Sequence, residues 1–72
     1  MASDICSRLG KRIREERKAR GWRQIDLAQH SGVHEVHISD LERGAREVGI
    51  KTLLAIAQAL SVKLEALVRG LD

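Results

Sequence analysis

Apolar residues recur along this chain at intervals of three and four, which is the spacing of amphipathic helices. Leu9 and Ile13 lie one turn apart and mark a first helix over about residues 7–20, with Gly21 as its C-terminal stop. Four shorter helices are predicted after it, over about residues 24–30, 35–43, 50–60 and 64–68. The chain contains no proline, no repeat and no low-complexity segment. The pattern therefore predicts an all-α fold with five helices.

The second and third predicted helices form the most informative pair. Residues 24–44 contain a small residue, Ala28, where two helices would cross, and Gly32 where a tight turn would join them. Three apolar residues then follow at inward-facing positions: Val33, Ile38 and Leu41. This arrangement is typical of a helix-turn-helix, whose second helix enters a DNA groove.

Length and cysteine content limit the possible classes of protein. Seventy-two residues allow one small core, so we expect a single domain over residues 1–72 with its core at about 8–68. A chain of this size is near the lower limit for independent folding, which favours oligomerisation. Cys6 is the only cysteine and excludes an intrachain disulfide. We find no signal peptide core and no membrane-length apolar run, and so we expect a cytoplasmic protein.

The net charge of +3 is unevenly distributed. Residues 1–23 contain eight basic and three acidic side chains, a net +5, whereas the remainder contains five basic and seven acidic ones, a net −2. A basic first third suits binding to a polyanion. The alternative is a solvated helix face on which Arg and Glu form pairs.

Trp22 is the only aromatic residue, so the core must be aliphatic. It stands just before the second predicted helix, where an apolar side chain can pack against the following turn. Stacking on a nucleic-acid base is the alternative, but such surfaces use several aromatic residues. We therefore interpret Trp22 as a packing residue.

Four segments together carry a resemblance to a known family. They are Leu-Gly-Lys-Arg-Ile-Arg at 9–14, Gly-Trp-Arg-Gln-Ile-Asp-Leu-Ala at 21–28, Ile-Ser-Asp-Leu-Glu-Arg-Gly at 38–44 and Leu-Leu-Ala-Ile-Ala-Gln-Ala-Leu at 53–60. With this spacing the chain resembles the phage repressor and Cro-like (Xre) helix-turn-helix family over about residues 8–68. Residues 42–53 further resemble the small controller proteins of restriction-modification systems.

The resemblance implies a five-helix, homodimeric regulator that binds a palindromic operator in double-stranded DNA. It also implies that Arg17 and Glu42 form a largely buried ion pair, and such a pair is structural because a desolvated charge needs its partner.

In this family the third helix lies in the major groove. The candidate base-reading residues, carried over by position, are Glu35, Val36, His37, Ser39 and Asp40. Val36 is apolar on a polar face, and it would contact a thymine methyl or else be a tolerated exposed valine. Glu35 and Asp40 replace the Gln, Arg or Thr common at these positions. Each carboxylate would accept from cytosine N4, orient a neighbouring Arg or His, or repel non-specific DNA.

Contacts to the DNA backbone are expected from residues around the two helices: Arg23, Gln24, His34, Arg43, Arg46 and Lys51. Arg23 replaces the usual N-capping Ser, Thr or Asn of the second helix, which sacrifices a cap in favour of a cation. His34 occupies the N-cap of the third helix. We expect its protonation, and that of His37, to strengthen phosphate binding.

Dimerisation is expected at the C-terminal end. The candidate interface residues are Ile50, Leu64, Leu67 and Val68. A two-fold dimer would place two recognition helices about 34 Å apart, facing successive major grooves. The alternative is that these side chains close the core of one subunit.

An enzyme or a metalloprotein is not expected. Cys6 falls in a segment that we expect to be frayed, and no orienting partner is visible for it. His34 and His37 are three residues apart and would make half a metal site, but no second pair of ligands exists. We also expect no cofactor and no small-molecule ligand. The alternative function is an antitoxin-type module that sequesters a partner protein, which the acidic residues of the third helix would suit.

Overall fold

The computed structural model describes residues 2–71, and the side chains of residues 5–71. It contains five helices: α1 (Ala2–Ala19), α2 (Gln24–Ser31), α3 (Glu35–Glu42), α4 (Ile50–Ala59) and α5 (Leu64–Val68). No strand occurs between residues 2 and 71. The predicted all-α fold with five helices is therefore confirmed.

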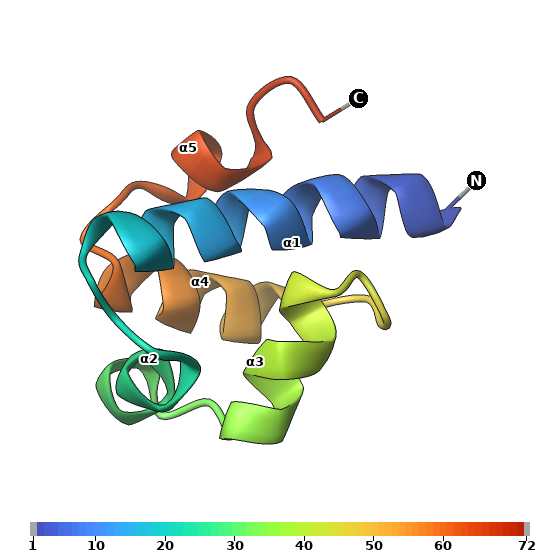
Figure 1. The fold of residues 1–72 in the computed structure, drawn as a ribbon. Helices are drawn as coiled ribbons and strands as arrows, with labels where there is room; N and C mark the ends of the chain where they lie inside the picture. The colour runs from blue at the N-terminus through green and yellow to red at the C-terminus, as the bar shows by residue number, and fades with distance from the viewer. Residues whose placement is uncertain (1, 72) are drawn as a thin grey trace.

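The long α1 runs through the middle of the molecule, as Figure 1 shows, with α5 on one side of it and the α2–α3 pair on the other. It packs against α3 and α5, while α4 packs against α2 and α5. The helix-turn-helix is thus held from behind by α1 and α4. This leaves the outer surfaces of α2 and α3 uncovered within one subunit.

The core is aliphatic. Its members come from all five helices and from the segment after α5: Leu9, Ile13, Leu27, Ile38, Leu41, Leu53, Ile56, Ala57, Leu60, Leu67 and Leu71. Trp22, Ala28 and Val33 pack against it from the side and are half-buried. The packing interpretation of Trp22 is therefore confirmed.

Leu67 corrects the predicted dimer interface. Its side chain is 1% exposed and belongs to the core of the single subunit. The reason is that α5 has only five residues, so it needs an inward anchor to dock on α1 and α4. Leu64 is half-buried against the same core. For Leu67, closing the core of one subunit is the correct explanation, whereas the half-buried Leu64 remains a candidate for the interface.

Helix α1 begins earlier than predicted. It starts at Ala2 rather than near residue 7, and Cys6 is a half-buried residue of the helix rather than part of a frayed segment. The C-terminal stop at Gly21 is confirmed by its φ of 70°. The amides of Gly21 and Trp22 donate to the carbonyls of Lys18 and Arg17, which is the Schellman pattern.

Gly10 allows α1 and α3 to approach closely. A Cβ built on this residue would lie 2.2 Å from the carbonyl oxygen of Leu41 and 2.7 Å from that of Glu42. Real Cβ atoms do not approach oxygen this closely, so only glycine fits here. The last turn of α3 is thereby held directly against the backbone of α1.

Several cations of the basic first third bind protein carbonyls. Arg8 donates to the carbonyls of Leu71, at 2.7 Å, and Gly70, at 2.8 Å. Arg12 donates to those of Leu67 and Arg69. These two arginines attach the chain after α5 to α1. Part of the basic charge is therefore structural, and it is not free for a polyanion.

None of the helices in residues 2–71 has both the length and the apolar content required of a membrane span.

Candidate nucleic-acid interface

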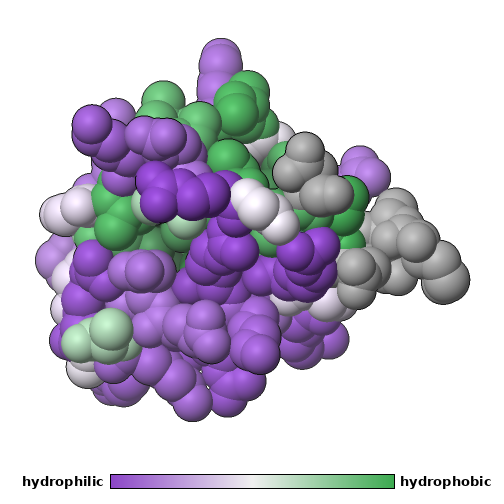
Figure 2. All heavy atoms as spheres, turned by 90° about the horizontal axis from the view of Figure 1, so that it is seen from above, coloured by the Kyte–Doolittle hydropathy of each residue, from purple (hydrophilic) through white to green (hydrophobic). Residues whose placement is uncertain are grey.

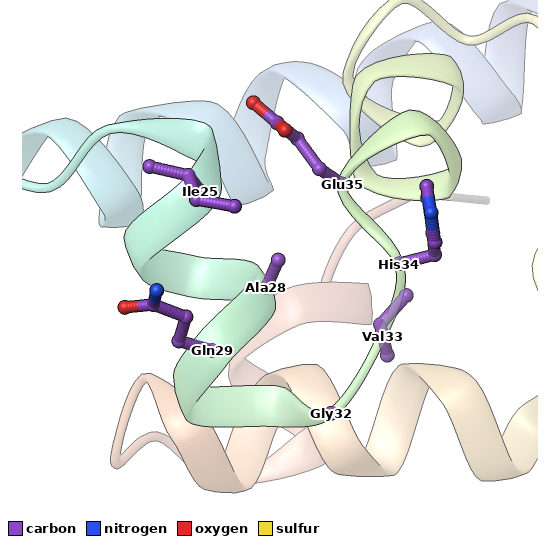
Figure 3. A pocket seen from close by; sticks show the side chains of 7 residues that line it. All are labelled: Ile25, Ala28, Gln29, Gly32, Val33, His34 and Glu35. Atoms are coloured by element: carbon purple, nitrogen blue, oxygen red, sulfur yellow. The ribbon is translucent and has the colours of Figure 1, made fainter.

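Helices α2 and α3 are joined by a tight turn centred on Gly32, whose φ of 75° lies in the left-handed region. The Gly32 amide donates to the Ala28 carbonyl and closes α2. A shallow hollow of about 490 Å³ separates the two helices, with Ile25, Ala28 and Gln29 on its α2 side and Val33, His34 and Glu35 on the other (Figure 3). The predicted position of the turn is confirmed.

The expected Arg17–Glu42 ion pair is present and joins α1 to α3. Arg17 Nε donates to Glu42 Oε2 at 2.7 Å and Nη2 donates to Oε1 at 2.9 Å, with the two side chains 9% and 3% exposed. Arg17 Nη1 also donates to the Trp22 carbonyl, at 2.7 Å. Hydrogen bonding to Glu42 raises the pKa of Arg17 above its ordinary value. The pair fixes the end of α3 against α1 and the segment before α2.

Gln24 belongs to the same network. Its side-chain amide donates to Glu42 Oε1 at 3.0 Å. Sequence reasoning assigned Gln24 to phosphate binding, but here the side chain satisfies the buried carboxylate. The second hydrogen of its side-chain amide has no acceptor among the described residues 2–71, and its backbone amide, in the first turn of α2, has none within the helix, so the predicted phosphate contact of Gln24 stays a prediction.

Helix α3 carries the candidate base-reading residues. Val36 is 63% exposed, although it is apolar. His37 and Ser39 are half-buried, and Ile38 between them points into the core. Glu35 is exposed, and its side chain extends toward α2 in Figure 3. Hydrogen bonding to Asp26 is the main cause that raises the pKa of Arg23, and the charge of Glu35 adds a smaller contribution.

Asp40 is tied to two arginines. It accepts from Arg43 Nη2 at 2.5 Å, and its second oxygen lies 3.6 Å from Arg46 Nε. Both arginines are exposed, whereas the Asp40 side chain is 22% exposed. Of the three roles open to this carboxylate, the geometry matches that of orienting neighbouring cations. Asp40 brings Arg43 and Arg46 together at the C-terminal end of α3.

His34 caps α3. Its Nδ1 accepts the Val36 amide at 3.1 Å, so this nitrogen carries no proton and Nε2 carries the hydrogen. Protonation would place a hydrogen on Nδ1 and break the cap. The expectation that protonation of His34 strengthens phosphate binding therefore conflicts with the cap, which needs the neutral ring. The neutral Nε2–H is the donor that remains for a phosphate.

Arg23 is paired within α2. Asp26 Oδ2 accepts from the Arg23 amide at 2.8 Å and from Nε at 3.2 Å, while Oδ1 accepts from Nη2 at 3.2 Å. These hydrogen bonds lower the pKa of Asp26 below its ordinary value. Asp26 thus accepts the backbone amide of the N-cap residue Arg23. The N-terminal cap of α2 is therefore only partly lost. Sequence reasoning missed Asp26, although an acidic residue at the third helical position is a known capping signal.

The remaining candidates lie outside α2 and α3. Lys51 is exposed in the first turn of α4, next to Ile50.

Trp22 stacks on His30, with ring centroids 4.3 Å apart and an angle of 4° between the planes. In the part of the chain that the structure describes, no group of His, Cys, Asp and Glu has the geometry to hold a metal ion.

These elements match a known protein family. The family model described as helix-turn-helix matches residues 13–67, which include the whole of α2, α3 and α4. The chain belongs to the helix-turn-helix family. The resemblance identified from its motifs is thereby confirmed, since the similar proteins include control proteins and a phage immunity repressor.

Two similar proteins are a control protein and a restriction-modification controller protein. The control protein C.SmaI of Serratia marcescens is 34% identical over 64 residues, which are 89% of this chain and 76% of that protein. The crystal structure of the controller C.AhdI from Aeromonas hydrophila has a TM-score of 0.84 and 35% identity, and the match covers 86% of this chain and 94% of that one.

A third similar structure contains DNA. The P22 c2 repressor in complex with a synthetic operator has a TM-score of 0.79 and 39% identity, over 86% of this chain and 94% of that one. Some relatives are much longer. The chain spans 26% of the length of the regulator y4dL of Sinorhizobium fredii, to which it is 36% identical over 52 residues.

Proposed function

We propose that this protein is a sequence-specific DNA-binding regulator, in which α3 reads bases in the major groove of a palindromic operator. The observation that carries the proposal is the exposed N-terminal half of α3. Val36, an apolar residue, stands there 63% exposed in the single subunit. In a major groove it would contact a thymine methyl, beside polar groups from Glu35, His37 and Ser39.

The cations near α3 support the same orientation. Arg43 and Arg46 lie just beyond its C-terminal end, and His34 lies at its N-terminal end. Contacts from both ends of the helix would hold two segments of the DNA backbone and fix α3 between them. Arg23 and Lys51 are exposed and would add weaker contacts. Asp40 keeps Arg43 and Arg46 in position and would not read a base itself.

This division of roles predicts different losses from two substitutions. Duplexes selected from a random pool would first define the preferred sequence, and the Kd would then be measured over a salt series. Val36→Ala is expected to weaken binding to the selected duplex by about tenfold, since a base contact contributes about 1–3 kcal/mol, with little change on a scrambled duplex. Arg46→Ala is expected to weaken both and to reduce the salt slope by about 0.9 for each lost phosphate contact.

Three outcomes would contradict the proposal. The first is a wild-type protein that selects no sequence. The second is binding without salt dependence. The third is a Val36→Ala variant whose losses equal those of Arg46→Ala on both duplexes, because α3 would then contact the backbone alone.

We further propose that the protein acts as a homodimer through α4 and the end of α5. Ile50 is 67% exposed and Leu54 is 44% exposed, and they lie one turn apart on α4. Val68 on α5 is exposed as well. Figure 2, which views the molecule from the α5 side, shows apolar surface between hydrophilic side chains. The proposed dimer surface therefore includes Ile50, Leu54 and Val68. Leu67, which was predicted to belong to it, is buried in the core.

Leu54→Asp is therefore expected to yield a monomer in analytical ultracentrifugation, because it places a charge in an apolar interface. Operator binding should weaken by at least tenfold, since both half-sites could no longer be held by one dimer. Ile5→Asp is the matched control, as Ile5 is 49% exposed on α1 and is outside the proposed surface. A Leu54→Asp protein that sediments like the wild type would show that α4 is not the interface.

The similarity to C.SmaI and C.AhdI favours a controller of restriction-modification genes as the specific role. A footprint upstream of the protein's own gene would support it. The antitoxin-type alternative drew on the acidic residues of α3. Asp40 is neutralised by Arg43 and Arg46, so the acidic surface is smaller than the sequence suggests.

A further inference from the structure

A polar cleft lies where α1, α2 and α3 meet. It has a volume of about 200 Å³ and is lined by Arg14, Arg17, Gln24, Ser39, Glu42 and Arg43. A water molecule occupies about 30 Å³ of liquid volume, so the cleft has room for a small anion and part of its hydration shell. The buried Arg17–Glu42 pair belongs to its lining, and Arg14 and Arg43 are exposed.

The charges around the cleft favour an anion. Glu42 is the one acidic residue in the lining, and its two oxygens already accept from Arg17 and Gln24. Arg43 donates to Asp40 through one terminal nitrogen, which leaves other donors of its guanidinium available. With Asp40 included, three arginines face two carboxylates, and one positive charge remains uncompensated.

That charge is best assigned to Arg14. Among the side chains of residues 5–71, it has no ion pair and no hydrogen-bond partner. It differs in this from the other arginines of α1, which bind carbonyls or carboxylates: Arg8, Arg12 and Arg17. An exposed arginine beside a polar cleft, with its donors unused, is suited to bidentate contact with an oxyanion.

We propose that this cleft binds one phosphate of the DNA backbone and that Arg14 is a phosphate-contacting residue of α1. The inference rests on the proposed function. Arg14 on α1 and Arg43 just after α3 hold the phosphate, and the Ser39 hydroxyl of α3 is a third donor. The unpaired amides in the first turn of α2 add favourable partial charge. A phosphate at this place also fixes the distance between the DNA strand and α3.

The test compares two exposed cations on the same helix. Lys11 lies about one turn before Arg14 and lines a different depression, so Arg14→Ala and Lys11→Ala remove equal charge from different places. Binding of the selected and the scrambled duplex is measured over a salt series. Arg14→Ala is expected to weaken both by about tenfold, as a charge-assisted hydrogen bond is lost. Its salt slope is expected to fall by about 0.9.

Lys11→Ala is expected to change the Kd by about twofold or less, as an exposed charge contributes little. Arg14→Lys, which keeps the charge, should restore most of the salt slope. Equal losses from Arg14→Ala and Lys11→Ala would overturn the site, because the attraction would then be diffuse. A loss confined to the selected duplex would overturn it too, since Arg14 would be reading bases. Wild-type protein that binds neither duplex overturns the proposed function itself.

Discussion

Glu42→Gln is expected to lower the free energy of unfolding by about 3–5 kcal/mol, because it leaves the buried charge of Arg17 without its counter-charge. The two side chains are joined by two hydrogen bonds, and Gln24 adds a third to the carboxylate. Small domains have a total stability of about 5–15 kcal/mol, so the loss is a large fraction of it. Urea denaturation followed by circular dichroism would measure the change.

A surface pair is the control for this experiment. Glu16 accepts from Arg20 at 3.0 Å, but its side chain is 39% exposed. Glu16→Gln is expected to cost less than about 1 kcal/mol. The double substitution Arg17→Met with Glu42→Leu should recover much of the loss, since it removes both charges. Similar losses from Glu42→Gln and Glu16→Gln would show that burial of the pair contributes nothing.

Gly10→Ala is expected to lower the melting temperature by about 10 °C or more. Alanine favours a helix over glycine by about 1 kcal/mol. The new methyl would nevertheless lie 2.2 Å from the Leu41 carbonyl oxygen, and α1 and α3 would have to separate. Overpacking costs about 1–3 kcal/mol or more, and a methyl this close to backbone oxygen belongs at the upper end, so a net loss of about 2 kcal/mol remains after the gain in helix propensity. A cost of 1 kcal/mol shifts the melting temperature of a domain this size by about 4–8 °C.

Gly49 provides the matched control, because a Cβ there would meet no atom within 4 Å. It is the N-cap of α4, so Gly49→Ser should leave the melting temperature unchanged or raise it slightly. Gly10→Ala should also weaken DNA binding, since α3 is displaced along with its reading residues. If Gly10→Ala melts at the wild-type temperature, the close contact between α1 and α3 is not needed for stability.

Local signals in the sequence predicted most of the fold. A glycine with positive φ ends α1 at Gly21, where it was expected, and another follows α3 at Gly44. The end of α4 has no such signal, because Ser61 adopts a φ of 58° in place of a glycine. Gly10 was a signal that the prediction did not use. A glycine inside a helix often marks close packing against a neighbouring element. Its partner could not be identified from spacing alone, because α3 is about thirty residues away.

The candidate site was predictable in its positions but not in its pairings. The Arg17–Glu42 pair followed from a resemblance to a known family. The use of Asp40 to hold Arg43 and Arg46, and of Gln24 to complete the buried network, depends on side-chain directions that helical periodicity does not fix. Leu67 was misassigned for a similar reason. A short apolar helix has one sequence pattern whether its residues face its own core or a partner.

The stacking of Trp22 on His30 gives the protein one optical probe. With no Phe or Tyr in the chain, its intrinsic fluorescence has a single source, at the junction of α1 and α2. The Trp22 backbone carbonyl accepts from Arg17, so the backbone that carries the indole is held by the residue whose charge Glu42 neutralises. Emission from this one side chain would therefore follow the buried ion pair directly. It would do so in the wild type and in each variant, without an added label.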